Sequence, residues 1–234
     1  MSQYSIRLRM GLRLVDYEVD PHWLDRVHKA IEKEIARGTR RLEKLEQSGN
    51  PEYLDSMADE ECEQIEELLG VAFVACQSFI NRILNRLQDL NEACMAEAGS
   101  KLPSLATRQE ALRIMAPTLA GSAFTDVEVI YAVGNYWKHS EEWPTCEVLT
   151  DTRRKCVWDL PNMRPIQKTT AEVVSSIGLC YGSTGNLRTT AKVLGVSDYM
   201  DLSPIRRALE SWAKHVLEVA RKGVEQLSRP STNP

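Results

Sequence analysis

The chain has 234 residues, of which 43% are hydrophobic and 26% are charged, a composition typical of a folded globular protein and not of a disordered one. Its formal net charge of −4 argues against a strongly electrostatic nucleic-acid binder. No apolar run approaches the ~20 residues of a membrane-spanning helix, and the N-terminus lacks the continuous apolar centre of a secretion signal. A cytoplasmic location without membrane association is therefore predicted.

Charge is unevenly distributed along the chain. Residues 51–150 carry seventeen acidic and six basic side chains, whereas residues 151–234 carry eight acidic and thirteen basic ones. A polyanion would therefore be attracted mainly to the C-terminal third. The six cysteines never form a C-x-x-C pair. They are predicted to be small buried residues in a reducing compartment, and no metal site or cofactor is expected.

The first candidate element alternates apolar and other residues with a period of two. The alternating apolar residues are Ile6, Leu8, Met10, Leu12 and Leu14. This period is typical of a half-buried strand, but no second strand follows nearby. Residues 1–19 are therefore expected to form an extended N-terminal arm, which either leads into the bundle or pairs across an oligomer.

Two long helical patterns follow. The first begins after Asp20-Pro21 and runs to about Gln47, and the second runs from about Tyr53 to Ala98. Ser48–Pro51 provides a clear stop and turn between them. Two long helices joined by a tight turn form an antiparallel hairpin, which is the natural nucleus of a helical bundle.

Shorter helices are expected after residue 100. Thr125 or Asp126 can cap a helix that ends before Trp143-Pro144, and residues 145–168 are expected to be mostly irregular. Further helices are predicted over 107–115, 169–177, 187–194 and from Asp201 or Ser203 to Leu227. The predicted fold is a single all-α domain over 1–234, with a bundle over 20–145 and C-terminal helices over 146–234 packed on it.

The stretch from Asp126 to Trp143 carries the most suggestive chemistry. Tyr131, Asn135 and His139 are spaced by four residues, so they share one face of a helix. A histidine can exchange a proton near neutral pH, an asparagine can orient a phosphate, and Lys138 can neutralise charge. The set is competent for metal-independent RNA cleavage, in which the 2′-hydroxyl attacks the adjacent phosphate. A histidine at a helix end also often serves only as a dipole partner or packed side chain.

A long helical hairpin followed by a helix that contains G-N-Y-W-K-H resembles the HEPN superfamily. Its motif is an arginine, a polar residue and a histidine, and many members are dimeric, metal-independent ribonucleases of toxin–antitoxin or antiphage systems. The resemblance implies that Asn135 and His139 take the polar and histidine positions. The arginine position falls on Gly134, so either the chain has kept only a binding role or another cation supplies the charge: Lys138, Arg113, Arg153 or Arg154.

The resulting hypothesis is a HEPN-like metal-independent RNA endonuclease or defence protein, a homodimer with a possible antitoxin-like protein partner. Its catalytic candidates are His139, Asn135 and Lys138, and its RNA-binding candidates are Tyr131, Arg113, Arg153 and Arg154. Three alternatives remain open. The chain could be an inactive HEPN-like binding or scaffolding subunit, or a helix-turn-helix protein using Arg188 and Lys192. It could also be an interaction protein that docks through the acidic residues 59–67.

Overall fold

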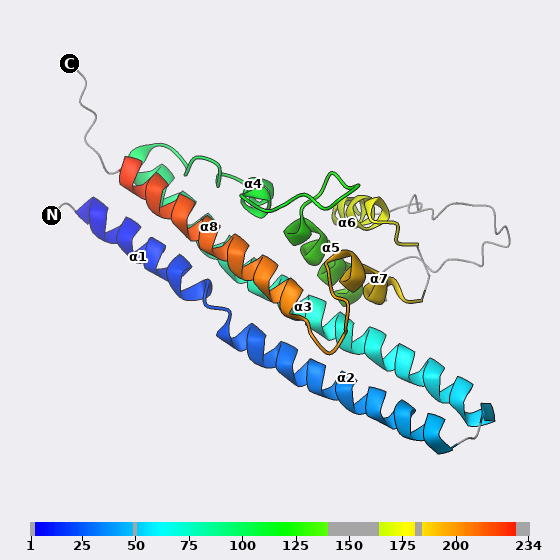
Figure 1. Ribbon diagram of the computed structural model, residues 1–234. Helices are drawn as coiled ribbons and strands as arrows, with labels where there is room; N and C mark the ends of the chain where they lie inside the picture. Colours follow the sequence, from blue (N-terminus) through cyan, green and yellow to red (C-terminus); the bar gives the residue numbers. More distant parts are fainter. Residues whose placement is uncertain (1–2, 49–50, 140–163, 181–183, 228–234) are drawn as a thin grey trace.

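The computed structural model describes residues 3–48, 51–139, 164–180 and 184–227, and it is an elongated bundle of α-helices (Figure 1). This confirms the predicted all-α class. In chain order the elements are α1 (Gln3–Glu18), α2 (His22–Ser48), α3 (Pro51–Ala98), α4 (Arg108–Arg113), α5 (Asp126–Lys138), α6 (Pro165–Ser176), α7 (Asn186–Val193) and α8 (Ser203–Leu227).

The long helix α3 is the centre of the molecule. Helices α1, α2, α5, α7 and α8 all pack against it, and α2 and α3 form the predicted antiparallel hairpin (Figure 1). Its buried apolar side chains recur every three or four residues, which is the period of one helix face. They include Phe73, Cys76, Ile80, Ile83, Leu84, Leu87 and Leu90.

The prediction for the N-terminal arm is wrong, because Gln3–Glu18 is the helix α1. Leu8 and Val15 are completely buried, and Leu12 packs against the same core. Ile6 and Met10 lie exposed on the other side of the helix. Two apolar faces on one helix place an apolar residue at nearly every second position, so the chain imitates the period of a strand.

Helices α4 and α5 begin at capping boxes. Thr125 accepts a hydrogen bond from the Glu128 backbone N–H at 3.2 Å, and the Thr125 N–H donates to the Glu128 carboxylate at 3.0 Å. Thr107 and Glu110 make the same reciprocal pair at the start of α4. Each box satisfies backbone donors that a helix N-terminus leaves unpaired, so it fixes where the helix begins.

The beginning of α6 differs from the prediction. Residues 165–168 were expected to be irregular, but α6 begins at Pro165 and the Arg164 N–H donates to the Gln167 side chain at 2.9 Å. Proline is favourable at the first helical position because its fixed φ suits the helix and its missing N–H is not needed there. The other residues of the irregular segment, 145–163, lie outside the described part of the chain.

Among the described residues, one helix is long and apolar enough to cross a membrane by length and composition. It contains an apolar window within Leu54–Ala98, of which 56% is buried. Its burial by neighbouring helices is consistent with the core helix of a soluble bundle. Cys76 and Cys94 are buried free thiols, as predicted. Cys180 differs from the prediction because it is disulfide-bonded.

Candidate functional site

The helix α5 lies unusually close to α3 at Gly134. A Cβ atom at this position would be 2.6 Å from the Phe73 carbonyl oxygen and 2.7 Å from the Gln77 Cβ. Only glycine allows this approach, since real Cβ atoms do not come that near to backbone. Gly134 is therefore a packing residue and its backbone is not accessible to a ligand. The arginine of the HEPN motif cannot occupy this position with α5 in its present place.

Asn135 lies between α3 and α6. Its side-chain oxygen accepts from Gln77 Nε2 at 3.2 Å, and its side-chain nitrogen donates to the Thr170 hydroxyl at 2.9 Å. The carboxamide thus bridges two helices and has one N–H left for another partner. It holds α6 against α5, which positions the wall of the adjacent groove.

His139 is the C-cap of α5. Its backbone N–H donates to the Asn135 carbonyl at 3.3 Å, and its ring is half-buried. Lys138 is exposed beside it. An ammonium group and an imidazole at a helix C-terminus complement the negative end of the helix dipole. The same pair is partly accessible to solvent, which a role in proton transfer would also require.

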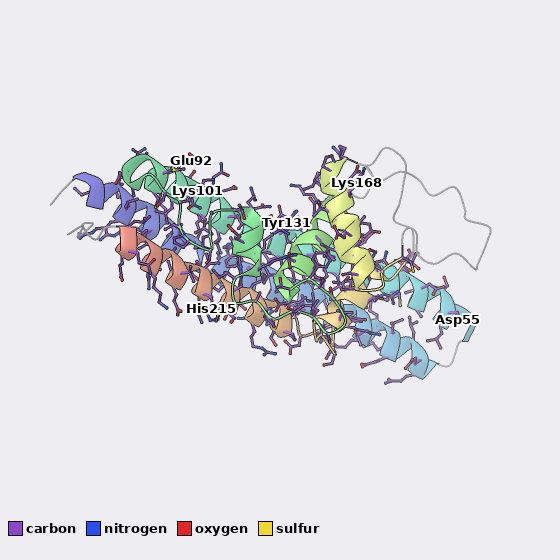
Figure 2. The ribbon with its side chains drawn as sticks, turned by 90° about the horizontal axis from the view of Figure 1, so that it is seen from above. Asp55, Glu92, Lys101, Tyr131, Lys168 and His215 are labelled. Carbon is purple, nitrogen blue, oxygen red and sulfur yellow. The ribbon has the colours of Figure 1, made fainter. Side chains whose placement is uncertain are left out.

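Tyr131 and Arg113 line a groove of about 710 Å³ between α4, α5 and α6. In Figure 2 Tyr131 lies between α4 and α6, and Lys168 lies at the far side of α6. The walls combine apolar side chains with hydroxyl, phenol and guanidinium groups, and with the carboxylates of Glu128 and Glu172. They include Arg108, Leu112, Phe124, Ala132, Ile166, Thr169, Thr170 and Val173. A cavity of this size that is mainly apolar and has a few polar groups is typical of a ligand site.

At the polar edge of the groove, one amide oxygen accepts hydrogen bonds from two side chains. Asn81 Oδ1 on α3 accepts from Arg108 Nη2 at 2.6 Å and from the Tyr131 hydroxyl at 3.3 Å. A second amide, Asn85, accepts from Arg108 Nη1 at 3.5 Å. These described partners of Arg108 are neutral, so the guanidinium keeps its full positive charge at the edge of an aromatic and apolar surface.

Arg113 is held differently. Its Nε donates at 2.7 Å to the carboxylate of Glu128, which is the residue that also caps α5. The buried carboxylate compensates the Arg113 charge and fixes the guanidinium on the wall of the groove. Arg153 and Arg154 lie outside the described residues. Among the described candidates, the structure therefore brings Tyr131, Arg113 and the Asn135 bridge to the groove and places Lys138 and His139 at the end of α5.

The surface beyond the end of α5 is acidic. A second cavity, of about 480 Å³, is lined by Trp137, Tyr136 and four carboxylates from α3, which belong to Asp59, Glu63, Glu66 and Glu67. Some carboxylates of the predicted acidic docking face form contacts with other residues of the chain. Glu61 is buried with its carboxylate 2.7 Å from the Arg41 guanidinium, and Glu66 accepts the backbone N–H of Leu187 at 2.6 Å.

The same contact bears on the helix-turn-helix alternative. Glu66 accepts the first backbone N–H groups of α7, from Leu187 and Arg188, and Leu187 is completely buried. A recognition helix would insert this N-terminal turn into a DNA groove. Here the turn is packed against α3, so the geometry does not favour DNA binding through α7.

Sequence reasoning did not identify Arg108, Asn81 or Thr170 as site residues. Asn81 and Arg108 are 27 residues apart and belong to different helices, so no local spacing pairs them. The amphipathic pattern of α3 was the only indication that Asn81 could belong to a site. Asn81 is a polar residue next to the buried Ile80 and close to Ile83.

Three comparisons with known proteins give no relative. No family model, curated protein or solved structure matches the chain.

Proposed function

We propose that this chain is a HEPN-like RNA-binding protein that holds an unpaired nucleotide of single-stranded RNA in the groove between α4, α5 and α6. The observation that carries the proposal is the placement of the Tyr131 phenol and the Arg108 guanidinium on the same Asn81 oxygen, at 3.3 and 2.6 Å. An aromatic ring and an uncompensated cation side by side match a nucleotide, whose base stacks and whose phosphate is anionic.

The remaining walls suit the same ligand. Phe124 and Ile166 offer apolar surface to a base, while the exposed Thr169 offers a hydroxyl group to a ribose. Arg113, fixed by Glu128, is a second guanidinium on the same wall. The chain as a whole is acidic, so this local site, and not an extended basic surface, is the part suited to an RNA strand.

RNA cleavage is the second candidate function. It is favoured by His139, whose half-buried ring follows the exposed Lys138 at the end of α5 and lies on the same helical row as Tyr131 and Asn135. In a metal-independent reaction the imidazole would take the proton of the 2′-hydroxyl or give one to the leaving 5′-oxygen. The HEPN resemblance also suggests a toxin–antitoxin or antiphage role, an antitoxin-like partner and a cytoplasmic location, which stay predictions.

The binding proposal is tested by fluorescence anisotropy with an unstructured, labelled RNA oligonucleotide in excess chelator. Arg108→Ala and Tyr131→Leu should each weaken binding by about tenfold, since a charge-assisted contact or a base–aromatic stack is worth roughly 1–3 kcal/mol. Tyr131→Phe should bind within about twofold of wild type because it keeps the ring.

Arg207→Ala is the matched control. Arg207 is an exposed arginine on α8 whose guanidinium donates to the neutral Ser203 hydroxyl at 3.0 Å, and its loss should leave binding unchanged. Equal weakening by Arg108→Ala and Arg207→Ala would contradict the proposal. Incubation with the same RNA then separates the two functions, because cleavage by wild type and not by His139→Ala identifies a nuclease. Binding without cleavage identifies a binding protein.

A further inference from the structure

Helix α1 carries apolar side chains on two opposite faces. The inner face contacts the bundle through residues such as Leu8 and Val15. The outer stripe consists of four large apolar residues that are between 44% and 74% exposed, namely Ile6, Met10, Leu14 and Tyr17. With 100° between successive residues, these four lie within an arc of about 80° on the side away from the core. A stripe of this kind on a surface helix marks a contact with another molecule.

The position of α1 leaves the outer stripe accessible. Helix α1 lies along one edge of the bundle, with α3 and α8 on its inner side (Figure 1). Beside the stripe is a hollow of about 370 Å³ between α1 and α3, lined by Met10 and Leu14 together with Asp89 and Glu92. Glu92 lies near the same end of the molecule as α1 in Figure 2.

The charges that border the stripe reverse in sign along the helix. Arg7, Arg9 and Arg13 precede Asp16 in the sequence. Arg9 and Asp16 are seven residues apart, so they lie on the same side of the helix, two turns from each other, with Arg13 between them and nearer to the stripe. In two antiparallel copies of α1 the basic part of one helix would face the acidic part of the other.

We propose that the outer stripe is the contact between two copies of this chain, paired antiparallel through α1 about a two-fold axis that crosses the stripe between Met10 and Leu14. Met10 then lies opposite the partner's Leu14, and Ile6 lies opposite the partner's Tyr17. Arg9 faces the partner's Asp16 twice, once on each side of the axis. Such a contact is self-complementary, as a two-fold interface requires.

The local charges favour a second copy over a lipid surface. A helix that lies on an anionic membrane is rich in basic residues along its whole polar side. The outer stripe is instead bordered by Asp16, Asp89 and Glu92 as well as by arginines. Asp16 already pairs with Arg221 of α8 at 3.0 Å, and a carboxylate can accept from a second guanidinium.

The size of the outer stripe sets the expected affinity of the dimer. Helix α1 has 16 residues and is about 24 Å long, so the contact is small and the dimer should dissociate in the micromolar range. Light scattering over about a hundredfold range of concentration should show the mass rising from 26.5 kDa towards twice that value. Met10→Glu should raise the dissociation constant by at least about tenfold, whereas Met115→Glu, at a similarly exposed methionine, should not.

A charge exchange tests the antiparallel arrangement. Arg9→Asp alone and Asp16→Arg alone should each weaken self-association, because like charges then face each other at both contacts. Mixing these two variants should restore the dimer, since every contact in the mixed pair joins opposite charges. Thermal unfolding of each variant checks that the monomer fold is intact.

Three results would overturn the proposal. One is a wild-type chain that stays monomeric over the whole concentration range, and another is a dimer that survives Met10→Glu. The third is a mixture of the two charge variants that remains monomeric. Binding of the wild-type monomer to vesicles of anionic phospholipid, lost in Met10→Glu, would assign the stripe to a membrane surface instead.

Discussion

Gly134 explains at the level of one residue why the chain departs from the HEPN motif. Its α carbon lies against the Phe73 carbonyl and the Gln77 side chain, where any Cβ would collide. The close packing that places α5 on α3 therefore excludes an arginine from the motif position. Beside the groove, the guanidinium of Arg108 on α4 has the neutral partners Asn81 and Asn85, whereas that of Arg113 is paired with Glu128.

Another residue with a defined physical role is His28 of α2. Its side chain is completely buried, with Nε2 3.3 Å from the Cys76 sulfur. Burial, reinforced by the nearby Arg206 guanidinium, lowers the pKa of His28 from 6.5 to about 4. The native state therefore holds a neutral imidazole at pH values where the unfolded chain is protonated.

This pKa predicts acid sensitivity. Below pH 6.5 the unfolded state binds a proton that the native state does not bind until about pH 4, so stability falls as the pH is lowered through this window. The loss should amount to about 3 kcal/mol. Urea unfolding at several pH values measures it, and His28→Leu should lack this part of the loss.

His22→Gln is the matched control for this experiment, because His22 is exposed at the start of the same helix. The free energy of unfolding of this variant should decrease as the pH is lowered, as it does in wild type. If the free energy of unfolding of His28→Leu fell as much as that of wild type when the pH is lowered, other groups would cause the acid sensitivity.

At the scale of elements, the helices themselves were largely predictable from sequence. Thr107 and Thr125 are each followed three residues later by glutamate, and both capping boxes form. The apolar residues between positions 69 and 90 recur every three or four residues, so the buried face of α3 can be recognised in the sequence. Helix α1 was not predictable in this way, because its exposed Ile6 and Met10 and its buried Leu8 together produce a period of two.

The candidate site was only partly predictable. The row of Tyr131, Asn135 and His139 follows from helical spacing, and the four-residue step from 131 to 135 is seen in α5. The side chains that hydrogen-bond to this row could not be predicted from the sequence. Gln77, Asn81 and Thr170 reach it from α3 and α6 through tertiary packing, which no local pattern encodes.

The segment between α3 and α4 depends on one buried side chain. Asn91 Nδ2 donates to the Leu105 carbonyl at 2.7 Å, and Asn91 Oδ1 accepts from the Leu102 N–H at 2.8 Å. The segment leads directly to Arg108, so Asn91 also fixes the position of the groove's cation.

Replacement of Asn91 by alanine should lower the free energy of unfolding by roughly 2–4 kcal/mol, because two buried backbone groups lose their partner. Asn85→Ala, an exposed position on the same helix, should change it by less than about 0.5 kcal/mol. Chemical denaturation measures both variants. A similar small effect at the two positions would contradict the role assigned to Asn91.

The whole molecule is an elongated bundle in which α1 lies along one edge, apart from α4, α5 and α6 (Figure 1). The groove is lined by residues of these three helices and the segments next to them, and the outer stripe belongs to α1. A dimer formed through α1 would therefore leave the groove of each copy accessible. Binding of RNA and pairing of two copies are expected to be independent, so a variant that abolishes one should retain the other.

The central claim is that a nucleotide of RNA occupies the groove. Its most direct test is ultraviolet crosslinking of an RNA that contains 4-thiouridine, followed by identification of the crosslinked peptides by mass spectrometry. We expect crosslinks to Tyr131 or Phe124, and their loss in Tyr131→Leu. Crosslinks confined to α1, α2 or α8, with those two residues unmodified, would contradict it.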